Sequence, residues 1–141
     1  MFALFGLDRR PEAACRGSIA AVGYIADKVE RLNKDLAGHS RRPIVYGVGI
    51  NAGEAIVGDI GYRDNVVFTA LGDSVNVAAR LQAMTKELGC EVIVADKVCS
   101  TAGLLADVPP KRRVSIRGRD DRLTIRVAKT AQMLTTSSAV G

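Results

Sequence analysis

The sequence predicts one domain of the α+β class, and three observations support this prediction. The chain has 141 residues, of which 48% are hydrophobic and 25% charged, the composition of a single globular domain. Apolar residues recur at spacings of three and four between Val22 and Leu36, which indicates an amphipathic helix. Short β-rich runs bounded by Gly, Asn and Asp occupy much of the remaining chain.

Two long helices and one short helix are expected. Pro11 is suited to the first turn of a helix, and Gly38 is suited to its end. A second helix is predicted over 75–88, after a turn at 72–74 that can cap it and before Gly89. The run 98–105 is consistent with a short third helix.

The remaining apolar runs are predicted to be strands. Residues 1–6 are interpreted as the end of a strand, and 44–50 and 55–61 as the two strands of a hairpin. Further strands are expected at 66–71 and 91–94, and a final hairpin over 114–127 turns at 118–121. The domain is assigned to 1–129. Residues 130–141 are assigned to a flexible tail, because 135–138 show no pattern.

Composition excludes several classes of function. Lys and Arg outnumber Asp and Glu by 20 to 15, which favours an anionic partner, but aromatics are only 4% and no base-stacking motif is present, so nucleic acid is not expected. No run approaches the roughly 20 apolar residues of a membrane span, and the start lacks a signal peptide, so a cytoplasmic location is expected. Three cysteines without CxxC spacing and one histidine argue against a disulfide framework, a zinc site or a Ser-His-Asp triad.

Asn76 and Arg80 are the strongest candidates for a functional pair. They lie four positions apart on a predicted helix and therefore share one face near its N-terminus. An amide beside a guanidinium suits a phosphate, because the guanidinium offers a fixed fork of donors and the helix N-terminus is electropositive. The alternative is that Arg80 pairs with a carboxylate of its own chain, such as Glu54 or Asp73.

The surrounding residues resemble the class III nucleotidyl cyclase domain. The resemblance rests on GVGINAGEA at 47–55, VGDIG at 57–61 and FTALGDSVNVAARL at 68–81, and it extends from Met1 to about Lys129. It implies a ferredoxin-like antiparallel sheet with helices packed on one face. It also implies conversion of ATP to cyclic AMP and pyrophosphate in a complete domain.

The resemblance also implies roles for individual residues. The matching Asn76 orients the ribose, and the matching Arg80 stabilises charge at the reacting phosphate. Thr69 lies where the family places a base-reading residue and favours ATP over GTP, although a Thr is equally ordinary in a strand. Arg117 matches a basic residue for the triphosphate, with a solvated hairpin as the alternative.

Two further aspartates and one polar segment have other counterparts in the family. Asp59 and Asp73 do not match the metal ligands. Residues 62–65 match the flexible arm that embraces a partner subunit.

The chain departs from the family at its N-terminal end. The family holds Mg²⁺ or Mn²⁺ with two aspartates on the opening strand and in a Gly-Asp-Gly turn, and residues 1–6 resemble the family segment directly after that turn. Both aspartates and the opening strands are therefore expected to be missing, through truncation or the choice of start site. No metal is expected to bind this chain, and it is expected to be inactive alone.

The open sheet edge predicts a homodimer or a swapped oligomer. The alternative function is a regulatory or dimerisation module that lends Asn76 and Arg80 to a partner.

Overall fold

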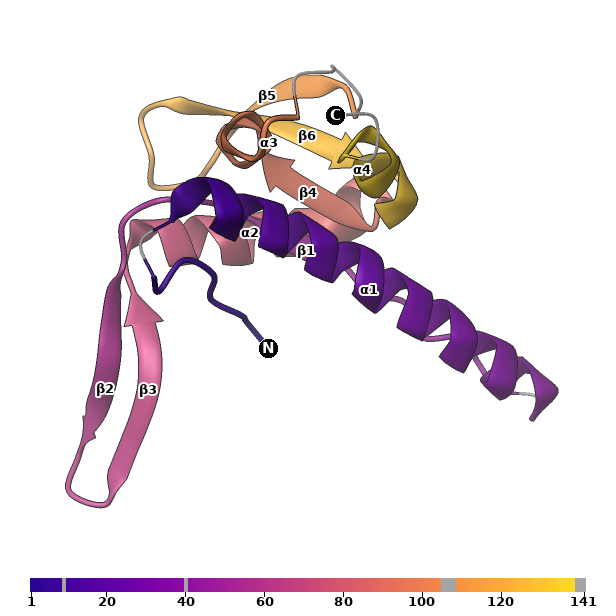
Figure 1. Ribbon diagram of the computed structural model, residues 1–141, viewed down its shortest axis with the longest axis horizontal. Coiled ribbons are helices and arrows are strands. Elements are labelled where there is room, and N and C mark those ends of the chain that lie inside the picture. The colour runs from indigo at the N-terminus through magenta and orange to yellow at the C-terminus, as the bar shows by residue number, and fades with distance from the viewer. Residues whose placement is uncertain (9, 40, 105–108, 139–141) are drawn as a thin grey trace.

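The computed structural model describes residues 1–8, 10–39, 41–104 and 109–138 (Figure 1). Ten elements follow one another along these ranges: α1 (Pro11–Gly38), β1 (Val48–Ile50), β2 (Ile56–Tyr62), β3 (Asn65–Leu71), α2 (Asp73–Leu88), β4 (Val92–Ala95), α3 (Asp96–Ala102), β5 (Lys111–Ser115), β6 (Arg122–Ala128) and α4 (Ala131–Ser138). The predicted α+β class is confirmed. No helix in the described ranges combines the length and the apolar character needed to cross a bilayer.

A four-stranded sheet forms the centre of the domain, in the order β1-β4-β6-β5. β1 runs parallel to β4, with Val48 opposite Val92, whereas β6 runs antiparallel to both β4 and β5. Residues Val92–Ala95 of β4 are all buried, as expected for a strand with neighbours on both sides and helices above and below it. The predicted hairpin over 114–127 is confirmed as β5 and β6.

Helices cover both faces of this sheet, whereas the sequence predicted helices on one face. Gly49 of β1 lies against α2, because a Cβ on this glycine would be 2.3 Å from the carbonyl oxygen of Ala78. Side chains alternate along a strand, so Arg126 of β6 lies on the opposite face, where it reaches α3. In Figure 1, α1, α3 and α4 lie in front of the sheet and α2 behind it.

The predicted pairing of 44–50 with 55–61 is wrong. Ile44 is bound to α1 instead, because the Asn33 side chain both accepts from the Ile44 amide at 2.7 Å and donates to its carbonyl at 3.0 Å. Downstream of β1, Asn51 donates to the Ser74 carbonyl at 3.0 Å, so the chain is drawn toward α2 and does not reverse. Only three residues of the predicted strand remain as β1.

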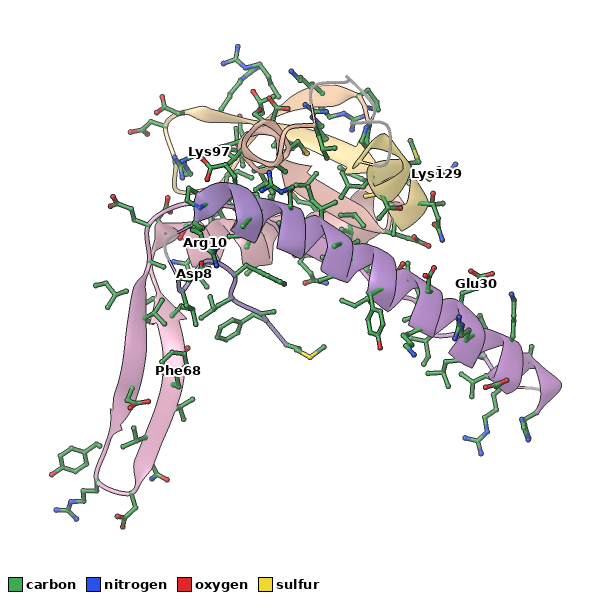
Figure 2. All side chains as sticks on the ribbon, viewed as in Figure 1. Asp8, Arg10, Glu30, Phe68, Lys97 and Lys129 are labelled. Carbon is green, nitrogen blue, oxygen red and sulfur yellow. The ribbon has the colours of Figure 1, made fainter. Side chains whose placement is uncertain are left out.

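The strands β2 and β3 pair only with each other and extend from the body as a hairpin, which we call the arm (Figure 1). Residues 62–65, predicted to be the arm, form only its tip, where Arg63 has a φ of 56°. Large apolar side chains are exposed along the arm: Ile56, Val57, Ile60, Tyr62, Val66, Val67, Phe68 and Leu71. Figure 2 shows Phe68 on the arm, well away from the sheet.

Two predictions for the chain ends are corrected. Residues 1–6 form no strand; Gly6 turns the chain with a φ of +89°, and the Phe5 ring lies 3.5 Å from where a Cβ on Gly17 of α1 would be. Residues 131–138, predicted to be part of a flexible tail, form α4, because Ala131 and Leu134 are fully buried in the core. Residues 139–141 lie outside the described ranges.

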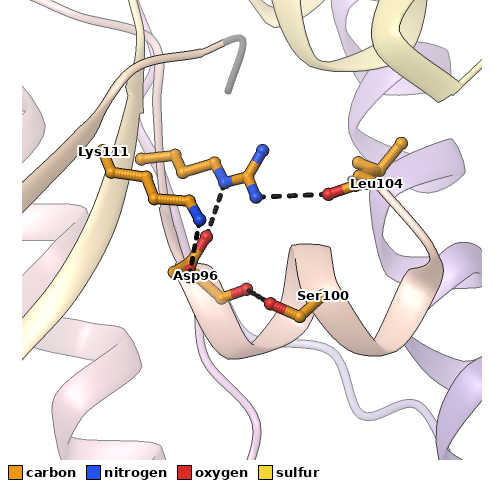
Figure 3. A network of polar contacts seen from close by, with 5 residues as sticks. Asp96, Ser100, Leu104 and Lys111 are labelled. Atoms are coloured by element: carbon orange, nitrogen blue, oxygen red, sulfur yellow. Dashed lines mark hydrogen bonds and ion pairs between the residues drawn. The ribbon is translucent and has the colours of Figure 1, made fainter. Parts of the chain in front are cut away.

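A buried polar network fixes α3 to the sheet (Figure 3). Arg126 is almost fully buried, and its Nε donates to the Asp96 carboxylate at 2.7 Å, while its Nη2 donates to the Leu104 carbonyl at 3.2 Å. Lys111 approaches the same carboxylate at 3.6 Å. The predicted third helix is confirmed with earlier bounds, and residue 105 lies outside the described ranges.

Candidate functional site

The site is built on the first half of α2, where the predicted second helix is confirmed. Val77 and Leu81 face the core and are almost fully buried, so Asn76 and Arg80, one position earlier in each case, face solvent. Gly89 ends the helix in the left-handed conformation with a φ of 60°. The amphipathic pattern of α2 therefore fixes the direction in which Asn76 and Arg80 point.

Glycines in β1 and just before it determine how closely α2 approaches the sheet. A Cβ on Gly47 would be 1.9 Å from the Thr85 hydroxyl, and a Cβ on Gly49 would be 2.3 Å from the Gln82 amide nitrogen. A side chain at Gly49 would collide with the backbone of α2, and one at Gly47 would collide with the Thr85 side chain. The GVG sequence at 47–49 thus positions α2 and, with it, the exposed pair.

The N-terminus of α2 is held from the preceding loop. The Ser74 hydroxyl donates to the Glu54 carbonyl at 2.7 Å, and the Gly72 carbonyl accepts from the amides of Val75 and Asn76. Gly72 occupies the N-cap without a side-chain cap, so the predicted capping turn acts through its backbone. No local signal in the sequence marks this role of Ser74, because its partner Glu54 lies 20 residues away.

Arg80 has no carboxylate partner in the described part of the chain, and the Asn76 side chain has no hydrogen-bond partner there. The alternative in which Arg80 pairs with Glu54 or Asp73 is therefore wrong: the Asp73 carboxylate pairs with Arg119 at 2.5 Å. Neither Arg80 nor Asn76 is buried against its own protomer. Both side chains remain available to a ligand.

The turn between β5 and β6 lies against Arg80. A Cβ on Gly118 would be 3.6 Å from Nη1 of Arg80 and 3.7 Å from its Nη2. Arg117 precedes this glycine and is exposed. The predicted triphosphate residue Arg117 is therefore next in the chain to a glycine that lies near the Arg80 guanidinium.

Thr69 is not joined to this group by any hydrogen bond within the described residues. It lies on β3 opposite Gly58, three residues before Gly72, and is partly buried. Thr69 lies at the base of the arm, because β3 ends at Leu71 and α2 begins at Asp73.

No cluster of His, Cys, Asp or Glu in the described ranges could hold a metal ion. Asp59 is exposed on the arm, and Asp73 is paired with Arg119. Burial raises the pKa of the Cys99 thiol to about 11, so this cysteine is a neutral core residue.

One cavity among the described residues lies away from the site. It has a volume of about 500 Å³ between α1, the 44–46 segment and α4, and its lining includes Val29, Tyr46 and Gln132 but none of the four candidate residues. One wall is fixed by Glu91, which accepts from the Tyr46 hydroxyl at 3.1 Å and from the Ala131 amide at 2.8 Å. The Glu91 carboxylate thereby caps the N-terminus of α4.

Known proteins with similar sequences include adenylate cyclases. Over 117 residues the chain is 30% identical to Adenylate cyclase 1 of Rhizobium meliloti (strain 1021), a match covering 83% of this chain and 17% of that protein. Over 87 residues it is 30% identical to an adenylate cyclase of Anabaena cylindrica, covering 58% of this chain and 17% of that protein. The chain thus spans about a sixth of the length of these relatives.

Solved structures give the same fold. The guanylyl cyclase Cya2 matches with a TM-score of 0.68 and 23% identity, over 80% of this chain and 56% of that chain. A bacterial light-regulated adenylyl cyclase matches with a TM-score of 0.58 and 23% identity, over 89% of this chain and 39% of that chain. No family model matches the chain. The chain is therefore similar in sequence to adenylate cyclases and shares the fold of the guanylyl and adenylyl cyclase structures.

Proposed function

We propose that this chain supplies the Asn76 and Arg80 half of a nucleotide site that is completed by a second subunit. The observation that carries the proposal is the unpaired guanidinium of Arg80 beside the Arg117-Gly118 turn. A nucleoside triphosphate is an anion that two exposed arginines can bind, and the relatives are named as adenylate cyclases.

In this proposal Asn76 orients the ribose and Arg80 stabilises the negative charge that develops at the α-phosphate as the 3′-oxygen attacks. Arg117 binds the outer phosphates. Thr69 contacts the base and favours ATP over GTP, so that the products are cyclic AMP and pyrophosphate. A hydroxyl both donates and accepts hydrogen bonds, so Thr69 discriminates weakly by itself.

The family's two metal ions do not fit the described residues. The exposed Asp59 and the paired Asp73 form no shared site, and no other carboxylate cluster suited to a metal is present in the described ranges. No step of the proposed reaction is therefore assigned to a metal ion on this chain, and we expect the complete domain to hold Mg²⁺ or Mn²⁺ with other carboxylates. The chain assayed alone is expected to form no cyclic AMP.

The exposed arm favours a second candidate, in which the chain is a non-catalytic regulatory or dimerisation module that lends Asn76 and Arg80 to a partner subunit. Its apolar side chains face solvent on a two-stranded hairpin, and a large apolar patch marks an interaction surface. Both candidate functions require that the Arg80 side chain be accessible to a partner subunit across an interface.

A complementation assay tests the proposal. The chain is mixed with a cyclase subunit that keeps its metal-binding aspartates but carries alanine at its own Asn and Arg positions, and cyclic AMP formation from ATP is measured. The wild-type chain should restore activity, and the Arg80→Ala and Asn76→Ala chains should not. Lys86→Ala removes an exposed positive charge from the last turn of the same helix and serves as the matched control. Equal activity with Arg80→Ala and wild type would contradict the proposal.

A further inference from the structure

An ion pair joins two segments of the proposed site that lie far apart in sequence. Asp73, the first residue of α2, accepts from Nη1 of Arg119 at 2.5 Å, across a separation of 46 residues. Arg119 belongs to the turn between β5 and β6, which also carries Arg117. The pair therefore ties the start of the helix that bears Asn76 and Arg80 to the turn that bears Arg117.

The geometry of this turn makes a second anchor useful. The Arg119 amide donates to the Ile116 carbonyl at 3.0 Å, and Gly118 has a φ of +87°, which defines a type II turn with Arg117 and Gly118 at its tip. Ile116 is buried and holds one side of the turn in the core. The Arg119 side chain holds the other side on α2.

The tip of the turn is also the part that touches Arg80. Gly118 lies so close that a Cβ there would be 3.6 Å from the Arg80 guanidinium. Any movement of the turn away from α2 would separate Arg117 from Arg80.

We propose that Asp73 and Arg119 are positioning residues that hold the β5–β6 turn on α2, so that Arg80 and Arg117 present one preformed site to a polyphosphate. The inference rests on the proposed function, since it assumes that a triphosphate binds between these segments. The Asp73 carboxylate alone would repel phosphate, and its pairing with Arg119 offsets that repulsion. The pair thus both orders the turn and neutralises a carboxylate at the electropositive end of α2.

In a competing arrangement, Arg119 is itself a phosphate ligand, and its ion pair with Asp73 competes with phosphate binding. The two arrangements predict opposite results for Asp73→Asn. If the pair positions the turn, removal of the carboxylate's charge weakens polyphosphate binding. If Asp73 only competes for Arg119, the same substitution strengthens it.

The experiment is a calorimetric titration of the full chain with ATP and, separately, with inorganic tripolyphosphate. Asp73→Asn and Arg119→Gln should each weaken binding by about two- to fivefold, the range for an exposed ion pair. Asp73→Glu and Arg119→Lys keep the pair and should retain most of the affinity. Asp120→Asn, an exposed carboxylate on the same turn, is the matched control and should leave binding unchanged. Tighter binding by Asp73→Asn, or equal binding by all variants, overturns the inference.

A second measurement separates this inference from the proposed function. In the ligand-free chain, hydrogen exchange at the Arg119 amide, which donates to Ile116, should be faster in Asp73→Asn than in wild type or Asp120→Asn. Failure of the wild-type chain to bind either probe would contradict the proposed polyphosphate site, whereas the exchange measurement tests the positioning of the turn by itself. Unchanged exchange in Asp73→Asn would overturn the positioning role whatever the binding result.

Discussion

Asp96 and Arg126 form an ion pair at 2.7 Å in which the arginine is almost completely buried. Asp96 begins α3 directly after β4, and Arg126 lies on β6 opposite Val94. The pair therefore joins a helix to the centre of the sheet at the point where the chain leaves the sheet. It lies apart from the candidate site, so its disruption tests the fold and not the chemistry.

We expect Asp96→Ala to lower the free energy of unfolding by about 3–5 kcal/mol, because a buried guanidinium loses its carboxylate partner. Glu30→Ala removes one partner of the exposed Glu30–Lys34 pair on α1, and it should change the free energy of unfolding by about 0.5 kcal/mol or less. Urea unfolding followed by circular dichroism measures both. Equal midpoints for the two variants would contradict the assigned importance of the buried pair.

Gly49→Ala should separate β1 from α2. The added Cβ would lie 2.3 Å from two backbone atoms, which cannot rotate away, and overpacking of this kind costs about 1–3 kcal/mol. Gly58→Ala in the arm, where a Cβ meets nothing within 4 Å, provides the control and should be close to neutral. Thermal unfolding of both variants measures the difference, and a Gly49→Ala chain as stable as wild type would refute the close packing.

Tyr46 should make stability fall at high pH. Burial, followed by the charge of Glu91 and the hydrogen bond to it, raises the pKa of Tyr46 from 10.0 to about 12. Between these values the unfolded chain releases the phenolic proton while the folded chain retains it, so unfolding becomes more favourable as the pH rises from 10 to 12. Urea midpoints measured across this range should fall more steeply for wild type than for Tyr46→Phe. Parallel curves would argue against the Tyr46–Glu91 contact.

Phe68→Ser should reduce self-association without unfolding the chain. Phe68 is 57% exposed on the arm, so its removal costs the isolated protomer little packing. Sedimentation velocity over a range of concentrations should give a larger share of monomer for this variant. Lys129→Ser, an exposed position outside the arm, is the control, and a wild-type chain that stays monomeric throughout would contradict association through the arm.

Local patterns in the sequence predicted most elements, and long-range contacts account for the errors. The apolar spacing of α1 and α2, with Gly89 after α2, was sufficient because each helix satisfies its own hydrogen bonds. Strand pairing depends on partners distant in sequence, and the parallel pairing of Val48 with Val92 left no local signal. The strand predicted at 44–50 is longer than the observed β1, because the side chain of Asn33, eleven residues before Ile44, accepts a hydrogen bond from the Ile44 amide.

In the candidate site, too, local features could be predicted from the sequence and long-range contacts could not. Asn76 and Arg80 could be placed on one face from their spacing alone, and their exposure follows from the buried Val77 and Leu81 beside them. The contact of Gly118 with Arg80 and the Asp73–Arg119 pair could not be predicted, since each joins segments far apart in the sequence. The sequence alone leaves Asp73 as a possible partner for Arg80, whereas in the fold Asp73 pairs with Arg119.

α1 contains 28 residues and is about 42 Å long, but its buried residues end at Ala26. The remaining turns extend beyond the sheet, as Glu30 illustrates in Figure 2. We therefore expect one continuous helix to have two local stabilities: its first half unfolds only with the core, while its second half, held to the following segment by the hydrogen bonds between Asn33 and Ile44, opens more readily from its C-terminal end. Limited proteolysis should begin in this outer half and leave a fragment whose sheet is intact.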